Sequence, residues 1–260
     1  MRGGHTEVPA LDARHRDSYA KEAEVYDRKR FASPSRAYYQ SHSNAVYREL
    51  SGAGTGVRIL DVATGTGRIA LGLAESGATV FGTDLTEAML RQALAKARNA
   101  RGGRLHFGLA NARALPFADD QFDVVVSVRF LHLFPPADQR AFIAEMWRVL
   151  KPGGRLILEY NNAYAGGVYR PLIDLITRLS GGPSGGRHRP SQTRALFEGY
   201  PPVARRGLWF PGMGWIAQWS PAAARWLDRA GQTVPVCYLT EQVLFHLRKP
   251  HSAAATSVAR

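Results

Sequence analysis

From Val57 onward, apolar and polar positions follow two alternating periods. Short apolar runs of strand length occupy residues 57–62, 78–84, 104–110, 122–128 and 155–160. Between several of them lie segments whose apolar residues are spaced three and four apart, as in 67–77, 86–100 and 137–150. This spacing is typical of amphipathic helices. Because buried strands joined by helices need right-handed crossovers, the pattern predicts a doubly wound, parallel sheet.

The segments flanking this region are less regular. Residues 1–18 are polar and are predicted to be poorly ordered, and helical periodicity runs from about Asp17 to Leu50, with a break near Pro34. After Tyr160 the pattern predicts a helix at 168–180, a basic loop at 181–191, strands at 203–210 and 241–249, and a short helix at 220–230. We therefore expect an α/β fold with a Rossmann-like, doubly wound, mostly parallel seven-stranded sheet and a helical cap.

Composition narrows the class of protein. The chain has 260 residues, of which 45% are hydrophobic, as in globular proteins. No apolar run approaches the roughly 18 residues of a membrane span, no signal-peptide pattern opens the chain, and Cys237 is the single cysteine. We therefore expect a cytoplasmic protein. The net charge is +13, and residues 161–260 hold twelve basic and four acidic residues. Either this is a solvated basic surface, or the last hundred residues face an anionic partner.

The first strand ends in a glycine-rich turn, within "ILDVATGTGRIAL" at residues 59–71. Gly65, Gly67 and Ala70 satisfy the dinucleotide fingerprint G-x-G-x-x-[GA], and Asp84 lies where a ribose-binding acid belongs. A nicotinamide-dependent oxidoreductase is therefore one interpretation. However, Asp61 directly precedes the turn, and a carboxylate there suits a cationic amino-acid cofactor better than a pyrophosphate, which it would repel.

Two further motifs follow the turn. "LPFADDQFDVV" spans residues 115–125, and "RVLKPGGRLIL" spans residues 148–158. Together with the turn and a closing strand, they resemble class I S-adenosylmethionine-dependent methyltransferases over about residues 56–160. The resemblance is to the small-molecule enzymes related to the ubiquinone and menaquinone methyltransferases. It implies an S-adenosyl-L-methionine-dependent methyltransferase that acts on a small molecule.

The resemblance also implies a role for individual residues. Asp84 would accept both ribose hydroxyl groups, and Asn111 would meet the adenine edge. The full implied set of cofactor-binding residues is Asp61, Ala63, Gly65, Gly67, Asp84, Leu85, Met89, Asn111, Ala112, Ser127 and Arg129. The family usually has glycine at position 63 and aspartate at position 111, so Ala63 and Asn111 are departures.

Methyl transfer to an acceptor that must lose a proton benefits from a base. His132 is the candidate, because it follows the fourth strand at the edge of the sheet where ligands bind; a structural role is the alternative. Candidate substrate-binding residues are Tyr26, Glu159, Tyr160, Arg170, Arg194 and Trp215. Aromatic residues outside the core motifs form either a hydrophobic seam or an apolar acceptor pocket. The spacing of histidines indicates no metal site.

These observations give an expected division of the chain. Residues 1–56 would be an N-terminal helical cap, 57–160 the cofactor-binding core, 161–235 a lid on the substrate side, and 236–260 the final strand and tail. The expected partner is a small-molecule acceptor, an anionic one if the basic residues face the pocket. The alternatives are an RNA or nucleic-acid methyltransferase or binding protein, an NAD(P)-dependent oxidoreductase, and a cofactor-binding protein without catalysis. The sequence lacks a separate RNA-binding module and the Asn/Asp-Pro-Pro-Tyr signature after strand four.

Overall fold

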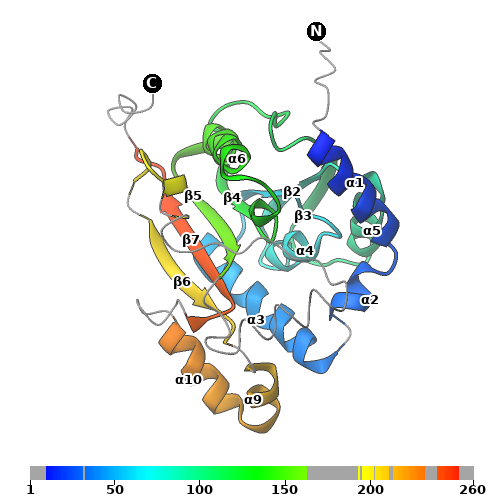
Figure 1. Ribbon diagram of the computed structural model, residues 1–260, viewed down its shortest axis with the longest axis vertical. Coiled ribbons are helices and arrows are strands. Elements are labelled where there is room, and N and C mark those ends of the chain that lie inside the picture. The colour runs from blue at the N-terminus through cyan, green and yellow to red at the C-terminus, as the bar shows by residue number, and fades with distance from the viewer. Residues whose placement is uncertain are drawn as a thin grey trace.

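The computed structural model describes residues 10–31, 33–162, 193, 195–201, 203–210, 213–231 and 239–251. Its strands are β1 (Arg58–Val62), β2 (Thr79–Asp84), β3 (Arg104–Leu109), β4 (Phe122–Ser127), β5 (Leu150–Asn161), β6 (Ala204–Leu208) and β7 (Gln242–Arg248). They form one sheet in the order β3-β2-β1-β4-β5-β7-β6. The first five strands are parallel, and β7 runs antiparallel to both β5 and β6. The predicted seven-stranded, mostly parallel sheet is therefore confirmed (Figure 1).

Helices cover both faces of this sheet. They are α1 (Ala10–Glu22), α2 (Tyr26–Phe31), α3 (Pro34–Ser51), α4 (Arg68–Ala74), α5 (Glu87–Ala97), η1 (Leu131–Leu133), α6 (Pro136–Val149), α9 (Met213–Trp219) and α10 (Pro221–Gly231). Within β1, Ile59 belongs to the core shared with α3 and α4, whereas Leu60 and Val62 belong to the core shared with α6. Burial of both faces explains why the strands read as continuous apolar runs.

The structure corrects two of the predicted boundaries. Within residues 1–18, the described part is not poorly ordered, because α1 begins at Ala10 and continues to Glu22. The strand predicted at 155–160 begins earlier: β5 starts at Leu150, immediately after α6, and includes the sequence "KPGG". The pairing of β5 with β4 shifts register between Phe122 and Val124, which accommodates this early start.

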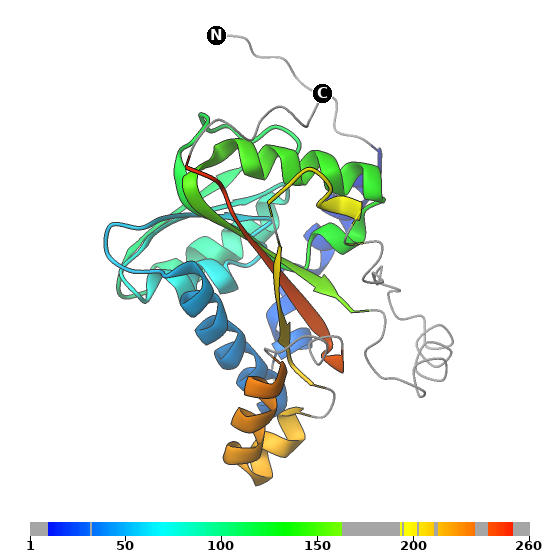
Figure 2. The same cartoon turned by 90° about the vertical axis from the view of Figure 1, so that its left-hand side faces the viewer.

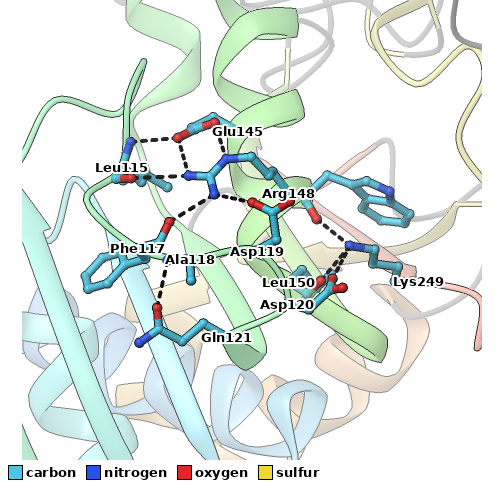
Figure 3. Close-up of polar contacts among 11 residues, drawn as sticks. Leu115, Phe117, Ala118, Asp119, Asp120, Gln121, Glu145, Arg148, Leu150 and Lys249 are labelled. Atoms are coloured by element: carbon cyan, nitrogen blue, oxygen red, sulfur yellow. Dashed lines mark hydrogen bonds and ion pairs between the residues drawn. The ribbon is translucent and has the colours of Figure 1, made fainter. Parts of the chain in front are cut away.

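The two motifs that follow the glycine-rich turn are joined by one side chain, Arg148 of α6 (Figure 3). Its Nη1 donates to the Phe117 carbonyl at 2.9 Å and to Asp119 at 2.6 Å. Its Nη2 donates to the Leu115 carbonyl at 3.2 Å and to Glu145 at 2.7 Å. Glu145 also accepts the Leu115 N–H at 2.8 Å, and the Arg148 guanidinium lowers the pKa of its carboxyl group. The motifs therefore fix the loop before β4 onto α6.

The pair α9 and α10 lies beyond one end of the sheet (Figure 2). It contacts α3 and β6, and Arg206 of β6 pairs with Asp228 of α10 at 3.6 Å and with Glu49 of α3 at 2.9 Å. Trp219 and Trp226 are both mostly exposed. Among the helices of the described part of the chain, none is both long and apolar enough to cross a bilayer.

Candidate functional site

A pocket lies at the carboxyl-terminal edge of β1, β2 and β4. Ligands bind at this edge in open α/β sheets. The floor comes from the strand ends, the glycine-rich turn and the start of α5, and the roof comes from α1 and α2. Its lining includes Asp12, His15, Tyr19, Tyr26, Asp61, Ala63, Gly65, Arg68, Asp84, Leu85, Met89, Asn111, Ala112, Arg129, Phe130, Phe134 and Phe142.

Asp84 ties the glycine-rich turn to the following helix. One carboxylate oxygen accepts the Gly65 N–H at 2.8 Å, and the other accepts the Thr86 N–H at 2.8 Å. Burial raises the pKa of the Asp84 carboxyl group, against these hydrogen bonds, which lower it. The Thr86 side chain and the Leu85 N–H also act on this carboxylate, which lines the pocket and faces a ligand there.

The turn contains three residues in the left-handed region of the backbone. The φ of Gly65 is 56° and that of Gly67 is 77°. A Cβ atom at Gly67 would lie 2.9 Å from the Ala93 Cβ, so this glycine permits close packing of α4 and α5. Ala63 has a φ of 60°, a conformation that costs a residue with a Cβ roughly 1 kcal/mol. The departure from the usual family glycine is therefore accommodated with backbone strain.

Asp61 is almost completely buried at the end of β1. It accepts a hydrogen bond from Thr64 Oγ1 at 2.6 Å, yet burial raises the pKa of its carboxyl group to about 7. A cation in the pocket would favour the ionised carboxylate, because an opposite charge in a poorly solvated site stabilises it. The arrangement therefore suits a ligand with an ammonium group.

The residues predicted to contact adenine line the same pocket as Asp84. Leu85, Met89, Asn111 and Ala112 all line the pocket. Asn111 Oδ1 accepts the Arg113 N–H at 2.9 Å, an Asx turn that fixes the side chain. Asn111 therefore offers its amide nitrogen and the second lone pair of Oδ1 to a ligand.

The roof is attached by an ion pair between a buried aspartate and a partly buried arginine. Asp12 of α1, which is 3% exposed, accepts from Arg113 Nε at 2.9 Å and from Nη2 at 3.2 Å. The third nitrogen of Arg113 donates to Asp138 of α6 at 3.1 Å, and the guanidinium lies 4.7 Å from the ring centroid of Phe142. These hydrogen bonds to two carboxylates raise the pKa of Arg113. The bidentate contact holds α1 over the pocket.

Other predicted site residues lie away from the pocket lining. Ser127 Oγ donates to the Val62 carbonyl at 3.0 Å, and His132 is buried in η1. Glu159 accepts a hydrogen bond from the Tyr47 hydroxyl group, beneath α3. Tyr160 packs in the hydrophobic core with Phe197 and Phe245. Arg170, Arg194 and the side chain of Trp215 lie outside the described residues.

The structure brings in residues that sequence reasoning did not assign to the site. His15 and Tyr19 line the pocket from α1, and Arg68 lines it from the first turn of α4. His15 packs edge-on against Phe134 with ring centroids 5.2 Å apart. The position of Arg68 next to the last loop glycine was a usable signal, whereas nothing in the local pattern of α1 indicated a roof.

Comparison with known proteins decides which cofactor this edge of the sheet serves. Residues 59–154 match a family described as a methyltransferase domain. This segment is a class I S-adenosylmethionine-dependent methyltransferase domain. The methyltransferase domain contains the glycine-rich turn, Asp84, the motif at 115–125 and the first part of the motif at 148–158.

Two curated relatives each match part of this chain. An uncharacterised protein of Mycobacterium tuberculosis is 48% identical over 106 residues, which are 41% of this chain and 38% of that protein. A demethylmenaquinone methyltransferase of Thermus thermophilus is 44% identical over 131 residues, 48% of this chain and 58% of that protein. The chain thus spans about half the length of these relatives or less.

A solved structure extends the similarity of fold beyond the methyltransferase domain. The magnesium protoporphyrin IX methyltransferase of Synechocystis, determined with bound S-adenosylhomocysteine, has a TM-score of 0.65 and 19% identity. The match covers 91% of this chain and 99% of that protein. At this identity the likeness concerns the fold, which therefore includes the helices and strands on both sides of the domain.

The pocket fits the cofactor of this family by its donors and acceptors. A buried carboxylate at Asp61 matches an ammonium group, the carboxylate of Asp84 matches a pair of ribose hydroxyls, and Leu85 with Met89 offers apolar contact to a base. A pyrophosphate would instead meet two buried carboxylates. Within the described residues, no group of three His, Cys, Asp or Glu side chains could hold a metal ion.

Proposed function

We propose that the chain transfers a methyl group from S-adenosylmethionine to a small molecule with an aromatic or apolar body. The observation that carries the proposal is a single pocket in which Asp61 and Asp84 face a roof of aromatic side chains. Tyr19 and Tyr26 contribute to this roof, and Phe130, Phe134 and Phe142 line the same pocket. This composition, apolar with a few placed polar groups, is typical of small-molecule sites.

Each part of the chain would have a distinct task in this reaction. The bound cofactor supplies a methyl group on a positively charged sulfur, which is already activated for displacement. Asp84 would hold ribose hydroxyl groups, and Asp61 would hold an ammonium group. The roof of α1 and α2, attached through Asp12 and Arg113, would exclude water and align the acceptor.

If the acceptor must lose a proton, a base has to reach it. His132 was the candidate from sequence, but it is not among the lining residues. His15 is among them, and its Nε2 atom is buried without a hydrogen-bond partner in the described part of the chain. We therefore favour His15 over His132 as the group that would accept a proton.

Two observations bear on the acceptor. The Thermus relative is a demethylmenaquinone methyltransferase by name, which supports an aromatic acceptor. Arg68 and Arg129 line the pocket, which supports an acceptor or cofactor group with negative charge. The predicted contribution of Arg170 and Arg194 falls outside the described residues. Substituted phenols and aromatic carboxylic acids are therefore the first acceptors to test.

The test separates the cofactor from the acceptor. Calorimetry should detect binding of S-adenosylmethionine and S-adenosylhomocysteine but not of NADH or NADPH. Formation of S-adenosylhomocysteine should then depend on an added phenol or aromatic acid. Binding of a nicotinamide cofactor instead would refute the proposal. Turnover with short RNA, but with no small molecule, would support the nucleic-acid alternative.

A further inference from the structure

The last two helices of the described structure form a projection with two exposed tryptophans. α9 and α10, joined by Ser220, extend beyond one end of the sheet (Figure 2). Trp219 at the end of α9 is 77% exposed, and Trp226 of α10 is 67% exposed. Tryptophan is highly buried on average, and exposed apolar surface that gathers in one region commonly marks an interaction site. The projection is therefore a candidate contact surface.

One face of α10 is exposed and carries positive charge. Four exposed residues follow the spacing i, i+3, i+4 and i+7, which places them on one side of the helix; they are Ala222, Arg225, Trp226 and Arg229. Neither arginine forms an ion pair with a residue that the structure describes. Because α9 contains no charged residue, the described helix pair presents cations and no exposed acid.

The opposite side of α10 attaches the helix pair to the rest of the protein. Ala224 is fully buried in a small core with Ala217 of α9. Asp228, the only acid of the pair, points inward: its carboxylate lies 2.9 Å from His42 Nε2 of α3 and 3.6 Å from Arg206 Nη2 of β6. A surface helix ordinarily exposes its charged residues and buries its apolar ones. α10 instead buries an acid and exposes a tryptophan, so packing among the described residues does not explain its outer face.

The charge of this face selects among possible occupants. In a symmetric contact between two copies of the chain, Arg225 and Arg229 would approach their own counterparts, and neither α9 nor α10 exposes an acid to pair with them. A single-stranded nucleic acid is bound along a basic groove, whereas α9 and α10 project from the body of the protein (Figure 2). An anionic lipid surface matches both kinds of side chain, because tryptophan concentrates at the membrane–water interface and arginine extends its charge to the lipid phosphates.

We propose that α9 and α10 bind the surface of an anionic lipid bilayer. Trp219 and Trp226 would lie at the level of the lipid headgroups, and Arg225 and Arg229 would contact the phosphates. Each basic residue near such a surface contributes about 1 kcal/mol, so each arginine should strengthen binding about fivefold. The inference does not rest on the proposed function, but it would bring the enzyme to a phase in which apolar acceptors dissolve.

Co-sedimentation with lipid vesicles tests the proposal on the full chain, without any cofactor. The protein should bind vesicles made of equal parts of phosphatidylglycerol and phosphatidylcholine, should bind pure phosphatidylcholine much more weakly, and should be released by salt. Arg225→Gln combined with Arg229→Gln should weaken binding about 25-fold. Trp219→Gln combined with Trp226→Gln should weaken it at least about tenfold, because two aromatic rings lose their apolar contact with lipid.

Two further measurements separate this face from general charge and from misfolding. Arg91→Gln combined with Arg98→Gln removes the same charge from exposed positions on and just after α5, and should weaken binding less than about threefold. Brominated phosphatidylglycerol should quench tryptophan fluorescence in the wild-type protein. Trp219→Phe combined with Trp226→Phe should remove most of this quenching yet still sediment with vesicles, since phenylalanine keeps an aromatic ring. Melting temperatures identify any variant that is unfolded, and the remaining variants then decide.

Several outcomes would overturn the proposal. Wild-type protein that does not sediment with the anionic vesicles, or that binds neutral vesicles equally well, has no anionic lipid site. Equal weakening by the α5 control would show that only the net charge of the chain matters. A dimer in sedimentation equilibrium that the tryptophan variants dissociate would assign the face to a second copy of the chain. Tighter binding of single-stranded RNA than of vesicles, lost in the same variants, would assign it to nucleic acid.

Discussion

Asp84 offers the sharpest test of how the pocket holds a nucleoside. Its two carboxylate oxygens accept the Gly65 and Thr86 N–H groups, each at 2.8 Å, and the carboxylate lines the pocket in which the ribose would bind. Asp84→Ala would therefore remove two ligand hydrogen bonds and two internal ones. Hydrogen bonds to charged groups contribute about 1.5–3 kcal/mol each, so the ligand term alone is about 3 kcal/mol or more. We expect S-adenosylhomocysteine to bind at least about 100-fold more weakly.

The internal hydrogen bonds complicate a simple affinity measurement. Losing the acceptor for the Gly65 N–H releases the glycine-rich turn, and this alone weakens binding. A thermodynamic cycle isolates the ribose contact. Calorimetry would compare S-adenosylhomocysteine with its 2′-deoxy analogue on wild-type protein and on Asp84→Ala.

The cycle distinguishes a direct contact of Asp84 with the ribose from an indirect effect of Asp84 on the glycine-rich turn. If Asp84 contacts the ribose, wild-type protein should discriminate against the deoxy analogue by about tenfold, and the variant should not discriminate at all. A variant that retains the full discrimination would refute the ribose role, even if its overall affinity fell. Affinity within about threefold of wild type would reject both roles of the side chain.

Four further predictions concern other residues. Arg148→Met should lower the free energy of unfolding by about 2–4 kcal/mol in a denaturant titration, because two carbonyls and two carboxylates lose their donor. The control is Arg91→Met, an exposed arginine whose loss should change the free energy of unfolding by less than about 0.5 kcal/mol. An equally small change for Arg148→Met would contradict the prediction. Ala63→Gly should leave stability unchanged or raise it by up to about 1 kcal/mol, since it removes strain at a φ of 60°; a clear loss would argue against the strain. Burial raises the pKa of Asp61 to about 7, so between about pH 4 and 7 the folded chain holds a proton that the unfolded chain releases. Stability of the ligand-free protein should fall as pH rises through this window, whereas affinity for S-adenosylhomocysteine should rise. An affinity that does not change with pH would show that the Asp61 carboxylate does not bind the ammonium group. His15→Ala should reduce turnover of an acceptor that loses a proton by about 100-fold, and His132→Ala should reduce it less; equal rates in both variants would exclude a histidine base.

The sheet was predictable because its strands are buried on both faces. Residues 57–62 and 122–128 carry apolar side chains toward α3 and α4 on one face and toward α6 on the other, so the apolar runs are continuous and of strand length. The glycine-rich turn was equally visible, since Gly65 and Gly67 adopt left-handed conformations that few other residues accept. Local sequence determined these features.

The roof of the pocket could not be predicted in the same way. The pattern of α1, "ALDARHRDSYAKE", is polar and has little apolar periodicity. What fixes this helix is the contact of Asp12 with Arg113, 101 residues away in the sequence. An ion pair of this kind leaves no local pattern, because either residue alone is typical of a solvated surface. His15 and Tyr19 entered the site through the same distant contact.

The pocket concentrates two kinds of unfavourable structure at the ends of neighbouring strands. Ala63 after β1 and Arg129 after β4 have φ values of 60° and 58°, and Asp61 of β1 has a carboxyl group whose burial raises its pKa to about 7. Strained backbone and buried charge persist only where the surrounding structure holds them, and here the paired strands do so. A ligand with an ammonium group near Asp61 and an anion near Arg129 would compensate both charges at once. The same features that destabilise the ligand-free pocket would thus select a ligand that carries both charges.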